Sequence, residues 1–174
     1  GIGKQTALEL AHMDYSLALV GRNSDKGDAV VSELIRETGN EFIQFHYADM
    51  SSMKSVKELA IEIQRSYDTI DILLNNAGAY FSQFKLTDDG FETTIALNHF
   101  AYFYFTELIL DMLKVDSGGR VINIASAAHK KAKLELNDLQ MKNEYKGWTA
   151  YMRSKLMNIM FTYECHHRFS DSGV

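Results

Sequence analysis

The sequence of 174 residues contains no proline and only one cysteine, Cys165. Average usage would give about nine prolines in a chain of this length. Their absence says nothing about chemistry by itself. A single cysteine excludes an internal disulfide, so the sequence favours a reducing compartment, and we predict a cytoplasmic location.

The chain also lacks an excess of basic charge and a long apolar run. Its formal net charge is −5 and its pI is near 5.7, which excludes the basic footprint expected of a nucleic-acid-binding protein. The longest apolar stretch, residues 100–113, is interrupted by one threonine and two acidic residues. An uninterrupted run of about 18 residues is expected of a membrane span. His166 and His167 are adjacent and point to different sides of a helix, so we expect no metal site from them.

The sequence does contain alternating apolar runs and amphipathic stretches. Strands that alternate with helices imply parallel β-α-β crossovers. We therefore predict an α/β fold with a doubly wound, Rossmann-like parallel sheet, in a single domain over residues 1–174. The predicted strands are 16–21, 41–48, 70–76 and 119–126, and the predicted helices are 24–39, 51–67 and 90–114. A last helix of about 18 residues is expected from Thr149.

Three motifs follow predicted strands, at the sheet edge where doubly wound folds bind ligands: Arg22, the NNAG turn at 75–78, and Ser126. A basic residue at the position of Arg22 favours a cofactor with a 2′-phosphate, hence NADP. Asp49 follows the second strand and could accept a hydrogen bond from an adenine amino group. The alternative is an ordinary acid at a helix N-terminus. For Ser126 the alternative is a helix or turn cap.

Two further features suit a ligand site. Gly1 and Gly3 precede an amphipathic helix, and small residues at a helix N-terminus let the backbone approach a phosphate. The alternative is an arbitrary chain end. Asn98 lies inside the apolar helix 90–114, where a buried amide needs hydrogen-bond partners; a structural and a functional role are equally open.

Tyr151 and Lys155, in the segment TAYMRSK, are four residues apart and share one face of the predicted helix. An ammonium beside a phenol lowers the pKa of the phenol from its usual value of about 10. Tyr151 could then act as a proton donor or acceptor near neutral pH. The alternative is an ordinary pair on a solvated helix face.

Taken in order, these motifs resemble the motif series of the classical short-chain dehydrogenase/reductase family, over the whole chain. The chain is most similar to the retinol dehydrogenase-like branch of that family. The narrower resemblance rests on residues 88–103, 137–140 and 151–164, and on the long interval between Ser126 and Tyr151.

The resemblance implies a set of catalytic roles. Tyr151 would be the general acid in carbonyl reduction and the base in alcohol oxidation. Lys155 would lower the pKa of Tyr151 and hold the nicotinamide ribose. Ser126 would hydrogen-bond the substrate oxygen, and Asn98 would help to order a water molecule linked to Lys155.

The resemblance also implies cofactor contacts, with NADPH as the favoured cofactor. Arg22 would face the 2′-phosphate, Asp49 the adenine, and Asn76 the adenine-side ribose. The pyrophosphate would lie against Gly1, Ile2 and Gly3.

The chain departs from the family pattern at both ends. The Thr-Gly that opens the glycine-rich turn is absent, and so is the Pro-Gly segment that follows a strand after the last helix. We therefore interpret the chain as an internal fragment that lacks the first strand and the C-terminal part.

The sequence thus predicts an NADP-dependent oxidoreductase that interconverts an alcohol and a carbonyl, with a retinoid-like or other hydrophobic substrate. One alternative is the same fold with a different small carbonyl substrate. Another is a catalytically silent, cofactor-binding regulatory or scaffold domain. The aromatic run at 102–105 is interpreted as core and subunit contact, so a homo-oligomer is among the expectations. We expect neither a nucleic-acid partner nor a membrane segment in this chain.

Overall fold

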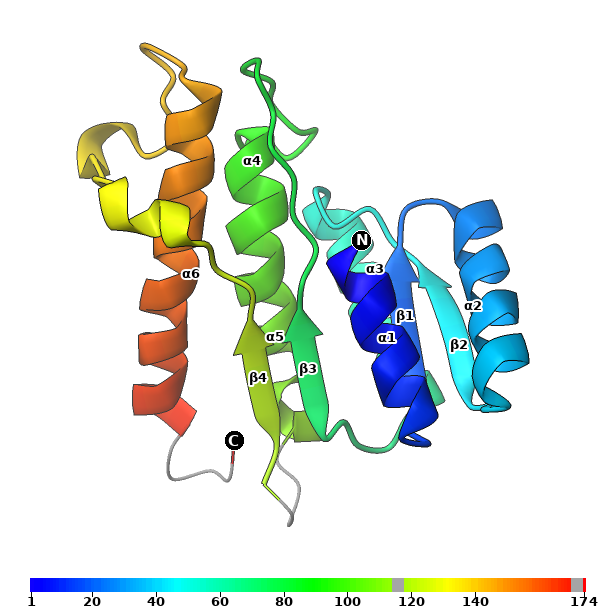
Figure 1. Cartoon of the computed structure of the whole chain (residues 1–174). Helices are drawn as coiled ribbons and strands as arrows, with labels where there is room; N and C mark the ends of the chain where they lie inside the picture. The colour runs from blue at the N-terminus through cyan, green and yellow to red at the C-terminus, as the bar shows by residue number, and fades with distance from the viewer. Residues whose placement is uncertain (114–117, 170–173) are drawn as a thin grey trace. The chain divides into compact units, whose positions relative to one another are not determined.

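The computed structural model describes residues 1–113, 118–169 and 174 (Figure 1). The chain divides into two compact units, residues 1–50 and residues 51–174. Each unit is described by itself below. The single domain expected over residues 1–174 stays a prediction.

The first unit is a β-α-β element preceded by a helix. Strand β1 (Leu17–Gly21) pairs in parallel with strand β2 (Ile43–Tyr47), and Leu17 lies opposite Ile43. Helices α1 (Ile2–His12) and α2 (Ser24–Thr38) complete the unit. The strands predicted at 16–21 and 41–48 and the helix predicted at 24–39 are confirmed. Gly39 ends α2 with a φ of 76°, a left-handed conformation that glycine adopts without strain.

The hydrophobic cluster of the first unit consists of aliphatic side chains. Side chains from both helices and both strands are buried together: Ala7, Ala11, Leu17, Leu34 and Ile43. Because α1 and α2 direct apolar side chains toward β1 and β2, burial of this cluster stabilises the unit. Asn40 is also buried in this unit, and its Nδ2 donates to the carbonyl oxygens of Ala11 and Tyr15.

The second unit contains another parallel strand pair, β3 (Ile72–Asn75) with β4 (Arg120–Asn123). Helix α3 (Met53–Ser66) precedes this pair, within the helix predicted at 51–67, and the side chain of Ser52 caps it by accepting a hydrogen bond from the N–H of Ser55. Between and after the strands lie α4 (Thr93–Ile95), η1 (Ala96–Phe100), α5 (Ala101–Leu113), η2 (Ala127–Lys131), η3 (Leu136–Asp138) and α6 (Gly147–Phe169). Figure 1 shows α5 against the β3–β4 pair and α6 beside β4.

The long helix predicted at 90–114 differs from the structure in two ways. It begins at Thr93, because the carboxylate of Glu92 accepts hydrogen bonds from two backbone N–H groups of α4 and so starts the helix there. It also contains a π-helical turn, η1, with Asn98 at its centre. Single π-turns inside helices often occur at functional sites. The end of the prediction, Lys114, lies outside the described residues.

The remaining elements follow the predicted order with shifted ends. Helix α6 begins at Gly147, two residues before the predicted start, and runs for 23 residues instead of about 18. The strands predicted at 70–76 and 119–126 are confirmed as the shorter β3 and β4. The described strands form two separate parallel pairs, so the β-α-β crossovers that the pattern predicts are present within each unit.

Cys165 belongs to an apolar cluster between α5 and α6, with Tyr102, Phe161 and Phe169. The thiol is buried, and this burial raises its pKa to about 11. Cys165 is therefore protonated near neutral pH and acts as a small apolar side chain.

Within the part of the chain that the structure describes, no helix combines the length and the apolar character needed to span a membrane.

Candidate active site

Helix α6 places Tyr151 and Lys155 on one face, as the i,i+4 spacing predicts. The ammonium nitrogen Nζ of Lys155 lies 5.8 Å from the centroid of the Tyr151 ring. Tyr151 is partly buried, whereas only 3% of Lys155 is exposed. The pair is therefore not an ordinary solvated contact, because one of its members is buried.

Lys155 is held at the carboxyl end of β4. Its Nζ donates a hydrogen bond of 2.9 Å to the carbonyl oxygen of Ile124, directly after the strand. It also lies 5.7 Å from the centroid of the Tyr102 ring. Burial lowers the pKa of Lys155 below its ordinary value, since an ammonium is less stable away from water.

Asn98 is fully buried and joins the end of β3 to α6. Its Oδ1 accepts a hydrogen bond from the N–H of Ala79, and its Nδ2 donates to the carbonyl of Ala79. The same Nδ2 donates to Oγ of Ser154 at 3.0 Å, and Ser154 in turn donates to the carbonyl of Tyr151. The serine of the YMRSK segment thus links Asn98 to the turn of helix that carries Tyr151. The water-ordering role of Asn98 stays a prediction.

The NNAG turn packs closely against this network at Gly78. A β-carbon added to Gly78 would lie 3.3 Å from both Oδ1 of Asn98 and Nζ of Lys155. This is tighter than nearly all contacts that real side chains make, so a glycine lets the turn approach the two polar groups.

The two asparagines of the turn have different surroundings. Asn75 is buried, and its Nδ2 donates to Oγ1 of Thr106 and to Oδ1 of Asn123, across to β4. Asn75 therefore has a structural role at the end of the strand pair. Asn76 is partly buried, and its predicted ribose contact stays a prediction.

Ser126 is the N-cap of the short helix η2. Its Oγ accepts a hydrogen bond of 3.2 Å from the N–H of Ala128, which is the capping role left open by the sequence. Ser126 is also two residues beyond the carbonyl that Lys155 holds, and η2 contacts α6. The capping bond uses one lone pair of the hydroxyl oxygen, so the O–H group remains available as a donor.

The candidate cofactor residues of the first unit lie at element ends. Gly1 is the N-cap of α1, and Ile2 and Gly3 are its first helical residues. This helix start has no side-chain cap, whereas Asn23 caps α2. Arg22, directly after β1, is exposed.

Asp49 lies two residues after β2 and is partly buried. Asp49 is not in a helix, because residues 48–52 precede the start of α3. Asp49 thus precedes Ser52, the N-cap of α3, and both the helix N-terminal acid and the adenine contact stay predictions.

Three residues of the second unit were not identified from the sequence. Trp148 stacks on the Tyr151 ring, with centroids 5.4 Å apart and an angle of 18° between the planes. Arg153 and Glu92 are buried charged residues with several hydrogen bonds each. The position of Arg153 inside YMRSK was the only sign in the sequence of a role for it. Its hydrogen-bond partners lie 15 to 20 residues away, so the sequence did not indicate them.

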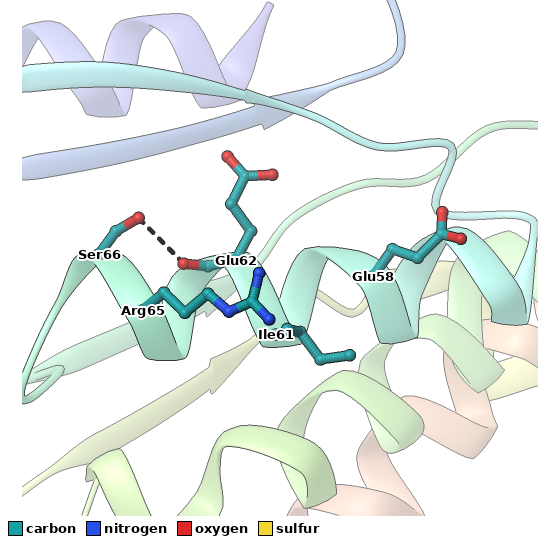
Figure 2. Close-up of a pocket in the computed structure, with 5 residues that line it drawn as sticks. All are labelled: Glu58, Ile61, Glu62, Arg65 and Ser66. Carbon is teal, nitrogen blue, oxygen red and sulfur yellow. Dashed lines mark hydrogen bonds between the residues drawn. The ribbon is translucent and has the colours of Figure 1, made fainter.

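A surface pocket lies along α3 and is lined by Glu58, Ile61, Glu62, Arg65 and Ser66 (Figure 2). All of these side chains come from one helix, and none is a candidate residue. The pocket is therefore not the site described above. Among the described residues, no group of three or more histidine, cysteine or acidic side chains could hold a metal ion.

Comparison with known proteins identifies relatives over the whole chain. A family model described as short chain dehydrogenase matches residues 1–174. Human retinol dehydrogenase 13 is 38% identical over 175 aligned residues, which cover 100% of this chain and 53% of that protein. The chain thus spans about half the length of the curated relatives it matches.

Solved structures share the fold. An uncharacterised protein from Mycobacterium paratuberculosis superposes with a TM-score of 0.85 and 32% identity, over 98% of this chain and 59% of that one. A short-chain dehydrogenase from Sphingobium yanoikuyae, solved in complex with NADPH, gives a TM-score of 0.78 and 24% identity, over 99% of this chain and 63% of that one. The second likeness shows the fold alone.

Proposed function

Because the chain belongs to the short-chain dehydrogenase family, we propose that its protein is an NADP-dependent oxidoreductase that interconverts an alcohol and a carbonyl. The observation that carries this proposal is the Tyr151–Lys155 pair on α6. Lys155 is buried and fixed at the end of β4, and the helical turn of Tyr151 is tied to Asn98 through Ser154. An ordinary surface pair would need none of these contacts.

Tyr151 would move the proton. In carbonyl reduction its hydroxyl donates a proton to the substrate oxygen, and in alcohol oxidation the phenolate accepts one. The nearby ammonium of Lys155 stabilises the negative charge that forms on the phenol oxygen. Ser126 would donate a hydrogen bond to the substrate oxygen, and Asn98 would hold the NNAG turn and α6 in register.

The residues of the first unit fit a phosphorylated dinucleotide. The start of α1 has no side-chain cap and presents glycines to an anion, and the exposed Arg22 offers a charge-assisted contact to a 2′-phosphate. Asp49 would contact the adenine, and Asn76, which belongs to the second unit, would contact its ribose. When bound, the nicotinamide supplies or accepts the hydride.

A hydrophobic substrate is supported by the surroundings of Tyr151. Trp148, which stacks on Tyr151, is 56% exposed, and the ring of Tyr80 lies 6.4 Å from it with 53% of its surface exposed. Exposed aromatic rings, one of them stacked on the ring of Tyr151, suit an apolar chain or a flat conjugated group. The relative named retinol dehydrogenase acts, by its name, on such an alcohol.

The test is an absorbance assay of nicotinamide oxidation with the full-length protein. Retinal, other hydrophobic aldehydes and short aldehydes or ketones are each offered with NADPH and with NADH. We expect turnover with NADPH and a hydrophobic aldehyde. NADPH binding without turnover on any substrate would instead favour the silent regulatory or scaffold domain.

The cytoplasmic location and the homo-oligomer remain predictions of this proposal. Cell fractionation checks the first, and light scattering of the purified protein checks the second.

A further inference from the structure

We propose that residues 133–145, here called the bridging segment, hold the helix of Asn98 and the helix of Tyr151 in register, with Arg153 and Glu92 as its two anchors. Both anchors are positioning residues. The inference rests on the proposed function, because register matters only if these helices carry the reacting groups.

The first anchor ties the bridging segment to α6. Arg153 is 3% exposed, although it carries a permanent charge. Its Nε donates to the carbonyl of Lys133 at 2.9 Å, and its Nη1 donates to the carbonyl of Asp138 at 3.1 Å. Its Nη2 pairs with Oε1 of Glu135 at 2.6 Å. A buried guanidinium needs such partners, so its planar group fixes the segment in one place on the helix.

The second anchor ties the same segment to the start of α4. Glu92 is fully buried, and its N–H donates to Oε1 of Gln140 at 2.7 Å. The hydroxyl of Tyr145 donates to Oε1 of Glu92 at 3.0 Å. The carboxylate of Glu92 also accepts from the N–H groups of Thr94 and Ile95. The segment is thereby bonded to the helix start that leads, six residues later, to Asn98.

The bridging segment also has internal hydrogen bonds between the anchors. The carboxylate of Asp138 accepts hydrogen bonds from the N–H groups of Lys142 and Asn143. Met141 is buried in a left-handed conformation with a φ of 54°, which a residue other than glycine adopts only when its surroundings impose it. A segment held by such internal contacts can transmit the position of one helix to the other.

The chain directly after the bridging segment packs tightly against the backbone of Phe81, which supports the same role. A β-carbon on Gly147, the first residue of α6, would meet the carbonyl oxygen of Phe81 at 2.2 Å. The hydroxyl of Tyr145 also contacts this carbonyl. Helices α4 and α6 are in contact, and Figure 1 shows their N-terminal ends at the same end of the unit.

The proposal predicts a loss of turnover without a loss of cofactor binding. In the full-length protein, Arg153→Met should lower kcat by about tenfold or more and leave the Kd for NADPH within about threefold, because misplacement of catalytic groups lowers the rate of the chemical step. Hydrogen exchange of the amides at 133–145 should become faster, since the anchor is gone. Tyr145→Phe, at the other anchor, should give smaller changes of the same sign.

The matched control is Arg168→Met. Arg168 also lies on α6 and also pairs with a glutamate, Glu107, at 2.7 Å, but it does not contact the bridging segment. Its substitution should leave kcat and the exchange at 133–145 unchanged. A merely structural role of Arg153 would lower the melting temperature but not kcat per folded molecule at the assay temperature.

The outcomes are decisive in each case. Faster exchange with unchanged kcat, or reduced kcat with unchanged exchange, overturns the proposal. If Arg153→Met does not fold, the same two measurements on Arg153→Lys and Tyr145→Phe decide it. If the wild-type protein shows no turnover, the proposed function fails. Hydrogen exchange alone then tests the bridging segment, and unchanged exchange at 133–145 in Arg153→Met would refute its anchoring by Arg153.

Discussion

The candidate residues named above for the two units of the chain have different surroundings. In residues 1–50 the buried polar side chains Asn40 and His46 are not candidate residues, and the candidate residue Arg22 is exposed beyond a strand end. In residues 51–174 the candidate residues Asn98 and Lys155 are 0% and 3% exposed, inside a hydrogen-bonded network. The candidate groups of the first unit are therefore an exposed charge and the uncapped N–H groups at a helix start. The second unit holds its polar candidate groups in place by hydrogen bonds before any ligand binds.

Substitutions in the two units should therefore differ in the size of their effects. A change at an exposed side chain in the first unit removes one contact and leaves the surroundings in place. A change in the second unit also disturbs the groups that share its hydrogen bonds, so effects there should be larger and less additive.

The largest effect is expected for Tyr151→Phe in the full-length protein. The substitution removes the hydroxyl that would transfer the proton and keeps the ring that stacks on Trp148. General acid–base catalysis contributes about 10²–10⁴-fold, so turnover should fall by that factor while NADPH affinity changes little. Steady-state kinetics and a binding titration measure the two quantities.

Tyr163→Phe is the matched control, because Tyr163 lies on the same helix and is 67% exposed. It should keep full turnover. Near-normal turnover of Tyr151→Phe would remove the basis for calling the second unit catalytic.

The next effect is expected in the first unit. Arg22→Ala should weaken NADPH binding by about ten- to a hundredfold, the range for a charge-assisted hydrogen bond, and leave NADH binding nearly unchanged. Because Arg22 is exposed, the melting temperature should not move. Titration with both cofactors measures the ratio, with Lys26→Ala as an exposed control on the same unit.

Equal losses for NADPH and NADH in Arg22→Ala would contradict the 2′-phosphate assignment. A clear loss of stability would also break the comparison, because it would show that Arg22 belongs to a network like those of the second unit.

A third prediction concerns stability and pH at Lys155. Burial holds the pKa of Lys155 below its ordinary value of 10.5, so the unfolded chain binds this proton more tightly than the folded one. The stability of the wild-type protein without cofactor should therefore rise, relative to Lys155→Met, as pH increases from the lowered pKa toward 10.5. Near neutral pH, Lys155→Met should be at least as stable as the wild type.

Denaturant unfolding of both proteins at a series of pH values measures this difference, and Lys130→Met, at an exposed site on η2, is the control. The carbonyl of Ile124 keeps a donor in the variant, since Nδ2 of Asn158 also contacts it at 3.3 Å. A variant that is less stable near neutral pH, with no relative change at higher pH, would refute the buried charge.

The smallest effect is expected for Tyr102→Phe. The hydroxyl of Tyr102 is buried without a hydrogen-bond partner among the described residues, and burial raises the pKa of Tyr102 above its ordinary value. An unsatisfied buried polar group is unfavourable, so its removal should raise the free energy of unfolding by up to about 1 kcal/mol. Thermal or denaturant unfolding measures the change.

The ring of Tyr102 beside Lys155 is retained in Tyr102→Phe, so turnover should stay close to that of the wild type. A loss of stability would mean that the hydroxyl has a partner, and that the polar network of the second unit extends farther than the hydrogen bonds described above.

The sequence by itself determined the features that depend on local geometry. Helical periodicity placed Val56, Leu59 and Ile63 on the buried face of α3, and the i,i+4 spacing brought Tyr151 and Lys155 together. These predictions hold because backbone geometry over one or two turns is set by the spacing of residues along the chain.

Only the tertiary structure decided which polar groups are buried and what they bond. Arg153 meets a backbone carbonyl 20 residues away, and Asn98 meets Ser154 56 residues away. A backbone carbonyl is the same at every position, so the sequence carries no sign of which one an arginine will bind. Burial is likewise a property of contacts between distant segments, and it is what distinguishes the Lys155 of this helix from an ordinary surface lysine.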